Sequence, residues 1–134
     1  MILASYHGIP KNYFDKGDPY HCYCQKTSRL IKEVFNKDIP ILTTFQSRFG
    51  PQEWLKPYTD KTLESLPKEG KKNVLVISPG FSSDCVETLE EISIQGKESF
   101  LEAGGEKFDS IPCLNDNEDH IKLLVHLINK SIKK

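Results

Sequence analysis

Four short apolar runs alternate with helical patterns along this chain, and the alternation constrains the fold more than any other feature. The apolar runs occupy residues 2–5, 39–45, 73–77 and 107–111, and the helical patterns occupy residues 21–35, 59–66, 85–103 and 118–132. Strands separated by helices are typical of βαβ units, in which right-handed crossovers join parallel strands. The sequence therefore predicts an α/β fold, an open, mostly parallel four-stranded sheet with helices on both faces.

The size and charge of the chain exclude several classes of protein. A length of 134 residues fits one domain, and a net charge of −1 predicts no nucleic-acid partner. The apolar stretch at 121–128 is shorter than the ~20 residues that span a bilayer. Met1 leads into the first strand without a basic leader, so we expect a cytoplasmic protein, and one cut from a longer chain.

The segments that follow the strands hold most of the unusual residues. In open parallel sheets, ligands bind outside the carboxyl ends of the strands. His7 follows the first apolar run, and histidine is the side chain best suited to accept a proton or bind a metal near neutral pH. By position alone, an ordinary surface histidine is an equally good interpretation.

The segment 46–58 combines a cation with aromatic rings. Arg48 and Trp54, the single tryptophan of the chain, would suit a large, planar, anionic ligand. The alternative is a small hydrophobic core under a long loop, and this interpretation is the stronger one for Phe45 and Phe49.

Two carboxylates lie four residues apart in the pattern at 85–103. Glu87 and Glu91 would share one helical face, and Gln95 would continue the row. Such a row could conduct protons or a divalent metal. A solvated acidic face near a helix N-terminus is the alternative, and the pattern alone slightly favours it.

The four cysteines, at positions 22, 24, 85 and 113, are expected to be free thiols. Cys22 and Cys24 are too closely spaced for a zinc half-site. The spacing of all four cysteines matches no pattern of iron–sulfur ligands.

Three long segments, taken together, resemble ferrochelatases in one register along essentially the whole chain. They are residues 5–10 with 17–20, residues 45–50 with 54–60, and residues 79–91 with 100–105, which read SYHGIP, GDPY, FQSRFG, WLKPYTD, PGFSSDCVETLEE and FLEAGG. Ferrochelatases insert ferrous iron into protoporphyrin IX in the last step of haem synthesis. They contain two similar α/β halves with the porphyrin between them.

The resemblance implies that residues 1–134 form a single chelatase-like domain, the C-terminal half of such an enzyme. Its partners would be protoporphyrin IX, ferrous iron and the N-terminal half. The implied roles are catalysis by His7 and Glu87, metal handling by His7, Glu87 and Glu91, and porphyrin binding by Tyr6, Ser47, Arg48 and Trp54. Gln95 departs from the acidic row of the family.

Metal insertion must remove two pyrrole protons, so a base is needed over the ring. His7 and Glu87 could divide proton transfer and metal handling in either order. The chain ends in Ser131–Lys134 without a cysteine extension, so we expect no [2Fe–2S] cluster. An isolated half should be folded but nearly inactive.

Two other functions stay open for this sequence. One is a short homodimeric chelatase for a related tetrapyrrole. The other is a non-catalytic module that binds haem or a metal. Peripheral contact with a membrane surface is also left open.

Overall fold

The computed structural model describes residues 1–35 and 37–132 and contains one parallel sheet. Its strands lie in the order β2-β1-β3-β4 and comprise β1 (Ile2–His7), β2 (Ile41–Gln46), β3 (Asn73–Ile77) and β4 (Lys107–Ser110). Every pairing is parallel, as crossover connections require. The predicted α/β fold is confirmed.

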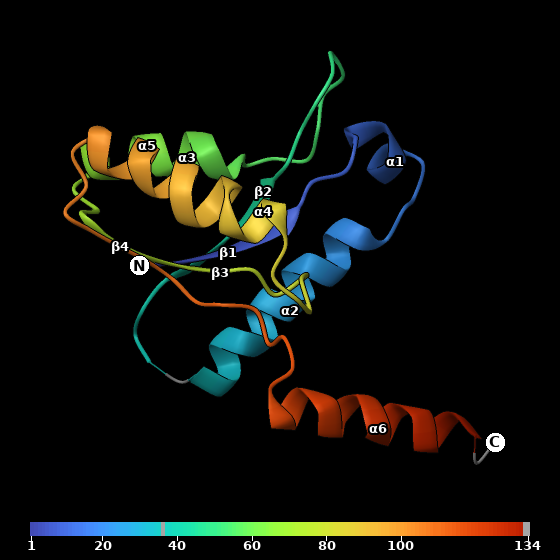
Figure 1. Ribbon diagram of the computed structural model, residues 1–134. Helices are drawn as coiled ribbons and strands as arrows, with labels where there is room; N and C mark the ends of the chain where they lie inside the picture. The colour runs from blue at the N-terminus through green and yellow to red at the C-terminus, as the bar shows by residue number, and fades with distance from the viewer. Residues whose placement is uncertain (36, 133–134) are drawn as a thin grey trace.

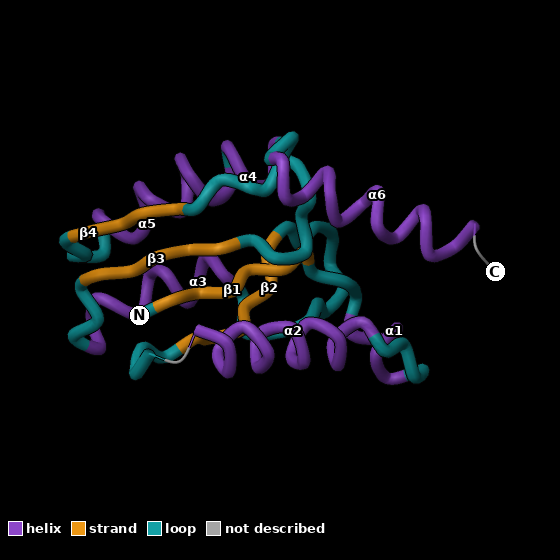
Figure 2. Tube along the Cα trace, turned by 90° about the horizontal axis from the view of Figure 1, so that it is seen from below, coloured by secondary structure: helices purple, strands orange, loops and turns teal. Residues whose placement is uncertain are grey.

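Helices lie on both faces of this sheet. They comprise α1 (Lys11–Asp15), α2 (Tyr20–Phe35), α3 (Thr59–Ser65), the 3₁₀-helix η1 (Leu66–Glu69), α4 (Val86–Leu89), the π-helix η2 (Glu91–Gly96), α5 (Lys97–Glu102) and α6 (Glu118–Ile132). Figure 1 shows α2 on one face and α3, α4 and α5 on the other, and Figure 2 shows the same layers from below. Within residues 1–35 and 37–132, no helix is both long enough and apolar enough to cross a membrane.

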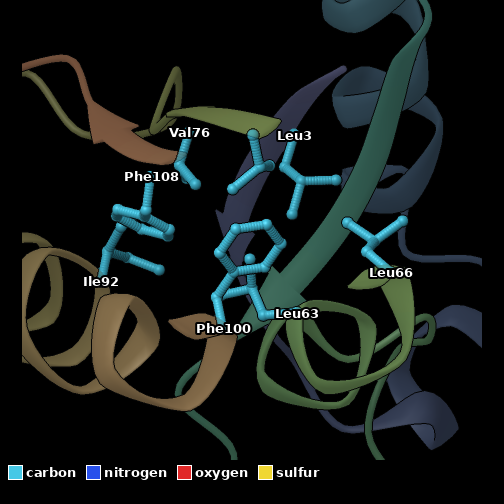
Figure 3. Close-up of a cluster of buried hydrophobic side chains, with 8 residues drawn as sticks. Leu3, Leu63, Leu66, Val76, Ile92, Phe100 and Phe108 are labelled. Atoms are coloured by element: carbon cyan, nitrogen blue, oxygen red, sulfur yellow. The ribbon is translucent and has the colours of Figure 1, made fainter. Parts of the chain in front are cut away.

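The core has two parts because successive side chains of a strand point to opposite faces. The larger part lies under α3 and α5 and contains Leu3, Leu63, Leu66, Val74, Val76, Ile92, Phe100 and Phe108, most of which are labelled in Figure 3. The smaller part lies on the α2 side and contains Ala4, Tyr6, Cys24, Phe45 and Leu55. Together the two parts fix the sheet between its helical layers.

The prediction of one continuous helix over 85–103 is wrong. The α-helical turn ends at Leu89, and a π-helix occupies Glu91–Gly96 before α5 begins. The backbone amide of Gln95 donates to the carbonyl of Glu90 at 2.9 Å, which is the i→i+5 bond of a π-turn. This wider turn alters the step from Glu91 to Gln95, so Gln95 does not continue the predicted row of side chains.

Helix α6 has the predicted bounds but does not pack against the sheet. Among the residues that the structure describes, it makes no extended contact with another helix or strand. Figures 1 and 2 both show it pointing away from the sheet toward the C-terminus. Helix α6 therefore belongs to neither helical layer of the sheet.

Candidate active site

His7 and Glu87 lie on the same face of the sheet. Strand β1 extends to His7, two residues beyond its predicted end, so His7 belongs to the strand and not to the loop after it. Leu3 packs under α3 and α5, and the two-residue period of a strand puts Ser5 and His7 on that same face. Helix α4, which carries Glu87, covers this face as well.

The His7 ring has one nitrogen available for chemistry. Its Nδ1 lies 2.7 Å from the carbonyl oxygen of Gly8. A carbonyl only accepts hydrogen bonds, so Nδ1 carries the proton and the lone pair of the neutral ring is on Nε2. The Phe81 ring lies beside it, with the ring centroids 6.3 Å apart. Nε2 can therefore take a proton or bind a cation.

The Glu87 carboxylate is held in its charged form. A hydrogen bond from the Cys85 side chain, a backbone hydrogen bond and the nearby His7 together lower the pKa of Glu87 below its ordinary value. His7 also contributes to this lowering, less than the two hydrogen bonds do. An ionised carboxylate and an imidazole on the same face of a sheet are both able to bind a divalent cation.

Gln46 connects these two residues, and sequence reasoning assigned it no role. It pairs with His7 in the β1–β2 register, and its side chain is buried. Its Nε2 donates to the backbone carbonyl of Glu87 at 2.6 Å, and its Oε1 accepts from the Ser5 hydroxyl at 2.7 Å. A polar side chain at the end of a buried strand was the signal that could have identified it.

Glu91 is bound by the segment after β2. One carboxylate oxygen accepts from the Ser47 backbone amide at 2.6 Å, and the other accepts from the Ser47 hydroxyl and from Gln46 Nε2. Ser47 has a φ of 64°, a left-handed conformation that is uncommon outside glycine. Its hydrogen bonds to Glu91 hold it there.

The side chains of His7, Glu87 and Glu91 do not converge on one point. Within the described part of the chain, no group of three histidine, cysteine, aspartate or glutamate side chains is arranged to hold a metal ion. His7 and Glu87 lie on the same face of the sheet, whereas the Glu91 carboxylate is occupied by Ser47 and Gln46. Gln95 donates to Glu90 and does not extend a row from Glu91.

Tyr6 is not part of the same wall as His7. Adjacent residues of a strand point to opposite faces, so the ring of Tyr6 lies on the α2 side. It is 3% exposed, and its hydroxyl lies 3.0 Å from the Ser28 hydroxyl of α2. The structure places Tyr6 in the part of the core on the α2 side.

Arg48 already has an anionic partner. It donates to both carboxylate oxygens of Asp60, at 2.6 and 2.8 Å, and its guanidinium lies 4.1 Å from the ring centroid of Tyr58. Burial would raise the pKa of Asp60, but the hydrogen bonds from Arg48 and a backbone amide hold it below its ordinary value. Arg48 therefore orders the segment after β2.

Phe49, not Trp54, is the exposed ring of this segment. Trp54 is 5% exposed and donates from Nε1 to the Phe49 carbonyl at 2.9 Å. Phe49 is 76% exposed, and its ring centroid lies 5.5 Å from that of Trp54. The small-core interpretation is thus confirmed for Phe45 and wrong for Phe49. Figure 1 shows this segment, between β2 and α3, extending beyond the body of the molecule.

Asp84 ties the loop after β3 to the loop after β4. It accepts hydrogen bonds from the Asn115 side chain, the Thr88 hydroxyl and the Cys113 amide. The bond from Asn115 is the largest contribution that lowers the pKa of Asp84 to about 2. These bonds fix the turn that leads into α4 and so the position of Glu87.

This low pKa predicts a specific acid sensitivity. A carboxylate with a depressed folded-state pKa contributes stability above its unfolded pKa, near 4, and loses it as the pH falls toward 2. We expect the free energy of unfolding to fall more steeply over this interval in the wild type than in Asp84→Asn. The two slopes should differ by about one proton, the one that Asp84 binds in the unfolded state but not in the folded state. Urea unfolding at successive pH values measures both slopes, and equal slopes would contradict the assignment.

The four-stranded parallel sheet, with helices on both faces, is an α/β fold of the chelatase-like class. The family model described as Ferrochelatase matches residues 1–132. The chain belongs to the ferrochelatase family.

Curated relatives support this assignment. Ferrochelatases of Rhizobium johnstonii and Rhizobium meliloti are 58% and 57% identical to this chain over 99% of its length. The ferrochelatase of Francisella tularensis subsp. novicida is 53% identical over 98%. The chain spans only 39–40% of the length of these relatives.

A solved structure shares the fold at much lower identity. It is the putative cobalamin (vitamin B12) biosynthesis CbiX protein of Marinobacter aquaeolei VT8, with a TM-score of 0.60 and 10% identity. The match covers 98% of this chain and 96% of that one. At this identity the likeness shows the fold alone.

Proposed function

We propose that this chain forms one half of an enzyme that inserts ferrous iron into protoporphyrin IX, with a second α/β half completing the site. The observation that supports the proposal is that His7 and Glu87 lie on one face of the sheet, in a chain of the ferrochelatase family. The relatives are about two and a half times as long, which supports an N-terminal half as the missing partner.

Glu87 and His7 differ in how readily they accept a proton, and this difference assigns them different steps of metal insertion. The lowered pKa of Glu87 makes it a weak base and a good ligand for the incoming ferrous ion. The free Nε2 lone pair of His7 suits the removal of pyrrole protons near neutral pH. We therefore assign metal delivery to Glu87 and proton transfer to His7.

The porphyrin would contact the segment after β2. Phe49 offers an exposed ring, Trp54 supports that ring from below, and Ser47 is held rigidly by Glu91. Tyr6 is left out of this wall because it is buried on the α2 side. Arg48 would support this wall through its ion pair with Asp60.

Binding of protoporphyrin IX is expected to quench the fluorescence of Trp54, the single tryptophan. Aromatic contacts are worth ~0.5–1.5 kcal/mol, so Phe49→Ala should raise the dissociation constant about 3- to 10-fold. A fluorescence titration of the 134-residue chain measures this change.

The matched control is Tyr23→Ala, which removes another exposed ring from α2. It should leave the dissociation constant within about twofold, because surface changes away from a site have small effects. Equal affinities of Phe49→Ala and the wild type would remove Phe49 from the porphyrin wall. No quenching in any variant would contradict porphyrin binding by this half.

A further inference from the structure

The buried side chain of Gln46 bonds to three different elements. It is 3% exposed, and its Oε1 accepts from the Ser5 hydroxyl of β1. Its Nε2 donates to the Glu87 carbonyl of α4 at 2.6 Å and to the Glu91 carboxylate of η2 at 3.3 Å. A backbone carbonyl only accepts hydrogen bonds, so the NH₂ end of the amide must face Glu87. The amide is therefore fixed in one orientation between β1 and the two helices.

The backbone of Gln46 holds the peptide that orients the His7 ring. Gln46 pairs with His7 in the β1–β2 register, and its carbonyl accepts from the Gly8 amide at 2.7 Å. The carbonyl of the same Gly8 binds Nδ1 of His7. A Cβ at Gly8 would lie 3.0 Å from the Gln46 carbonyl oxygen, a tight contact, so this close approach favours glycine. Gln46 thus contacts the supports of both His7 and Glu87.

Helix α4 has little packing of its own to fix the direction of Glu87. It has only four residues, Val86–Leu89, and of these only Thr88 is buried. Among the residues that the structure describes, α4 makes no extended contact with a strand. A single helical turn is not stable by itself. The position of Glu87 therefore depends on the hydrogen bonds around α4, and the bond from Gln46 ties it to the sheet.

We propose that Gln46 is a positioning residue that sets the separation between the His7 imidazole and the Glu87 carboxylate. Its main chain holds the peptide beside His7, and its side chain holds the peptide of Glu87. Displacements of about 1 Å can cost on the order of 10²-fold in rate, so such a tether matters for catalysis. The role rests on the proposed function, because the separation matters only if both side chains act on one porphyrin and one metal ion.

The competing explanation is that the amide only stabilises the fold, and Thr44 allows the two roles to be distinguished. Thr44 lies two residues earlier in β2, so its side chain is on the same face of the sheet. It is fully buried and accepts from the Thr59 hydroxyl at 2.9 Å. That bond leads to α3 and not to α4, so Thr44 shares the burial of Gln46 without its contact to Glu87.

Gln46→Met keeps the length of the side chain and the backbone bond to Gly8 but removes the amide. We combine the variant with the amino-terminal part of a rhizobial ferrochelatase and measure initial rates of iron insertion. Groups that orient metal ligands typically contribute 10- to 100-fold, so kcat should fall by about this factor. KM for protoporphyrin IX should stay within about threefold, because the contacts of Phe49 with Trp54 do not involve the amide.

Thr44→Val is the matched control, since it also removes a buried hydrogen bond from β2. It should lower the urea midpoint of unfolding, as Gln46→Met does, yet keep kcat within about twofold of the wild type. Circular dichroism establishes that both variants are folded in the assay. Equal losses of kcat in the two variants would assign Gln46 a purely structural role and overturn the proposal.

A double-mutant cycle tests whether Gln46 acts through Glu87. In a Glu87→Gln chain, Gln46→Met should lower kcat by no more than about twofold further, because the group that it positions is already disabled. A further loss of about 10-fold or more would mean independent effects and would overturn the proposal. Gln46→Asn keeps a buried amide but is too short to reach both Ser5 and Glu87, so it should show the same pattern in a second, polar variant. Wild-type kcat in both Gln46 variants would also overturn the proposal.

The same assays distinguish failure of this inference from failure of the proposed function. Wild-type kcat in Glu87→Gln alone would contradict the proposed function, and the positioning role with it. A loss of kcat in Glu87→Gln without a loss in Gln46→Met would contradict only the positioning role.

Discussion

Glu87→Gln is expected to reduce iron insertion at least 100-fold when this chain is combined with the amino-terminal part of a rhizobial relative. The substitution keeps the size of the side chain and removes the charge that the lowered pKa maintains. Positioned acid–base and metal-handling groups typically contribute 10²- to 10⁴-fold to a rate. The rate of protohaem formation, followed by absorbance, measures the loss.

The matched control is Glu90→Gln, three residues further along. Glu90 is exposed, and its carboxylate accepts only from Gln95 among the described hydrogen bonds. We expect its rate to stay within about twofold of the wild type. Equal losses in the two variants would mean that the general acidity of the helix matters and not Glu87 itself.

The second large effect concerns the core. Phe100→Ala should lower the free energy of unfolding by about 3–5 kcal/mol, because it removes a fully buried ring and leaves a cavity. Figure 3 shows the Phe100 ring among Leu63, Phe108 and neighbouring side chains. A Cβ added at Gly105 would lie 2.2 Å from this ring, so the turn after α5 is closed directly against it.

Urea unfolding at a low protein concentration, where association does not contribute, measures this loss as a lower midpoint with an unchanged slope. Leu101→Ala is the control, since the next side chain of α5 is partly exposed. It should cost about 1 kcal/mol or less. Similar midpoints for the two variants would contradict the central place of Phe100 in the core.

The fold could be predicted from the sequence because its signals are local. Apolar runs give the four strands, and the periodic patterns give α2 and α6 with bounds within one residue. The position of His7 at the carboxyl end of the first strand could also be predicted, to within two residues. These features depend on neighbouring residues and on the geometry of parallel sheets.

The departures depend on contacts between distant residues. The π-turn places Glu91 against Ser47, a pairing across 44 positions that no periodicity reveals. The burial of Tyr6 on the α2 side likewise depends on its contact with Ser28, 22 positions away. The exposure of Phe49 and the course of α6 away from the sheet likewise carry no periodic signal in the sequence.

Complementation tests the central claim most directly: His7 and Glu87 form half of an insertion site. The isolated chain should insert iron into protoporphyrin IX at a rate close to background, and adding the amino-terminal part of a rhizobial ferrochelatase should restore a rate that depends on Glu87. Full activity of the isolated chain would contradict the claim of half a site. A restored rate that Glu87→Gln and His7→Ala leave unchanged would contradict the site itself.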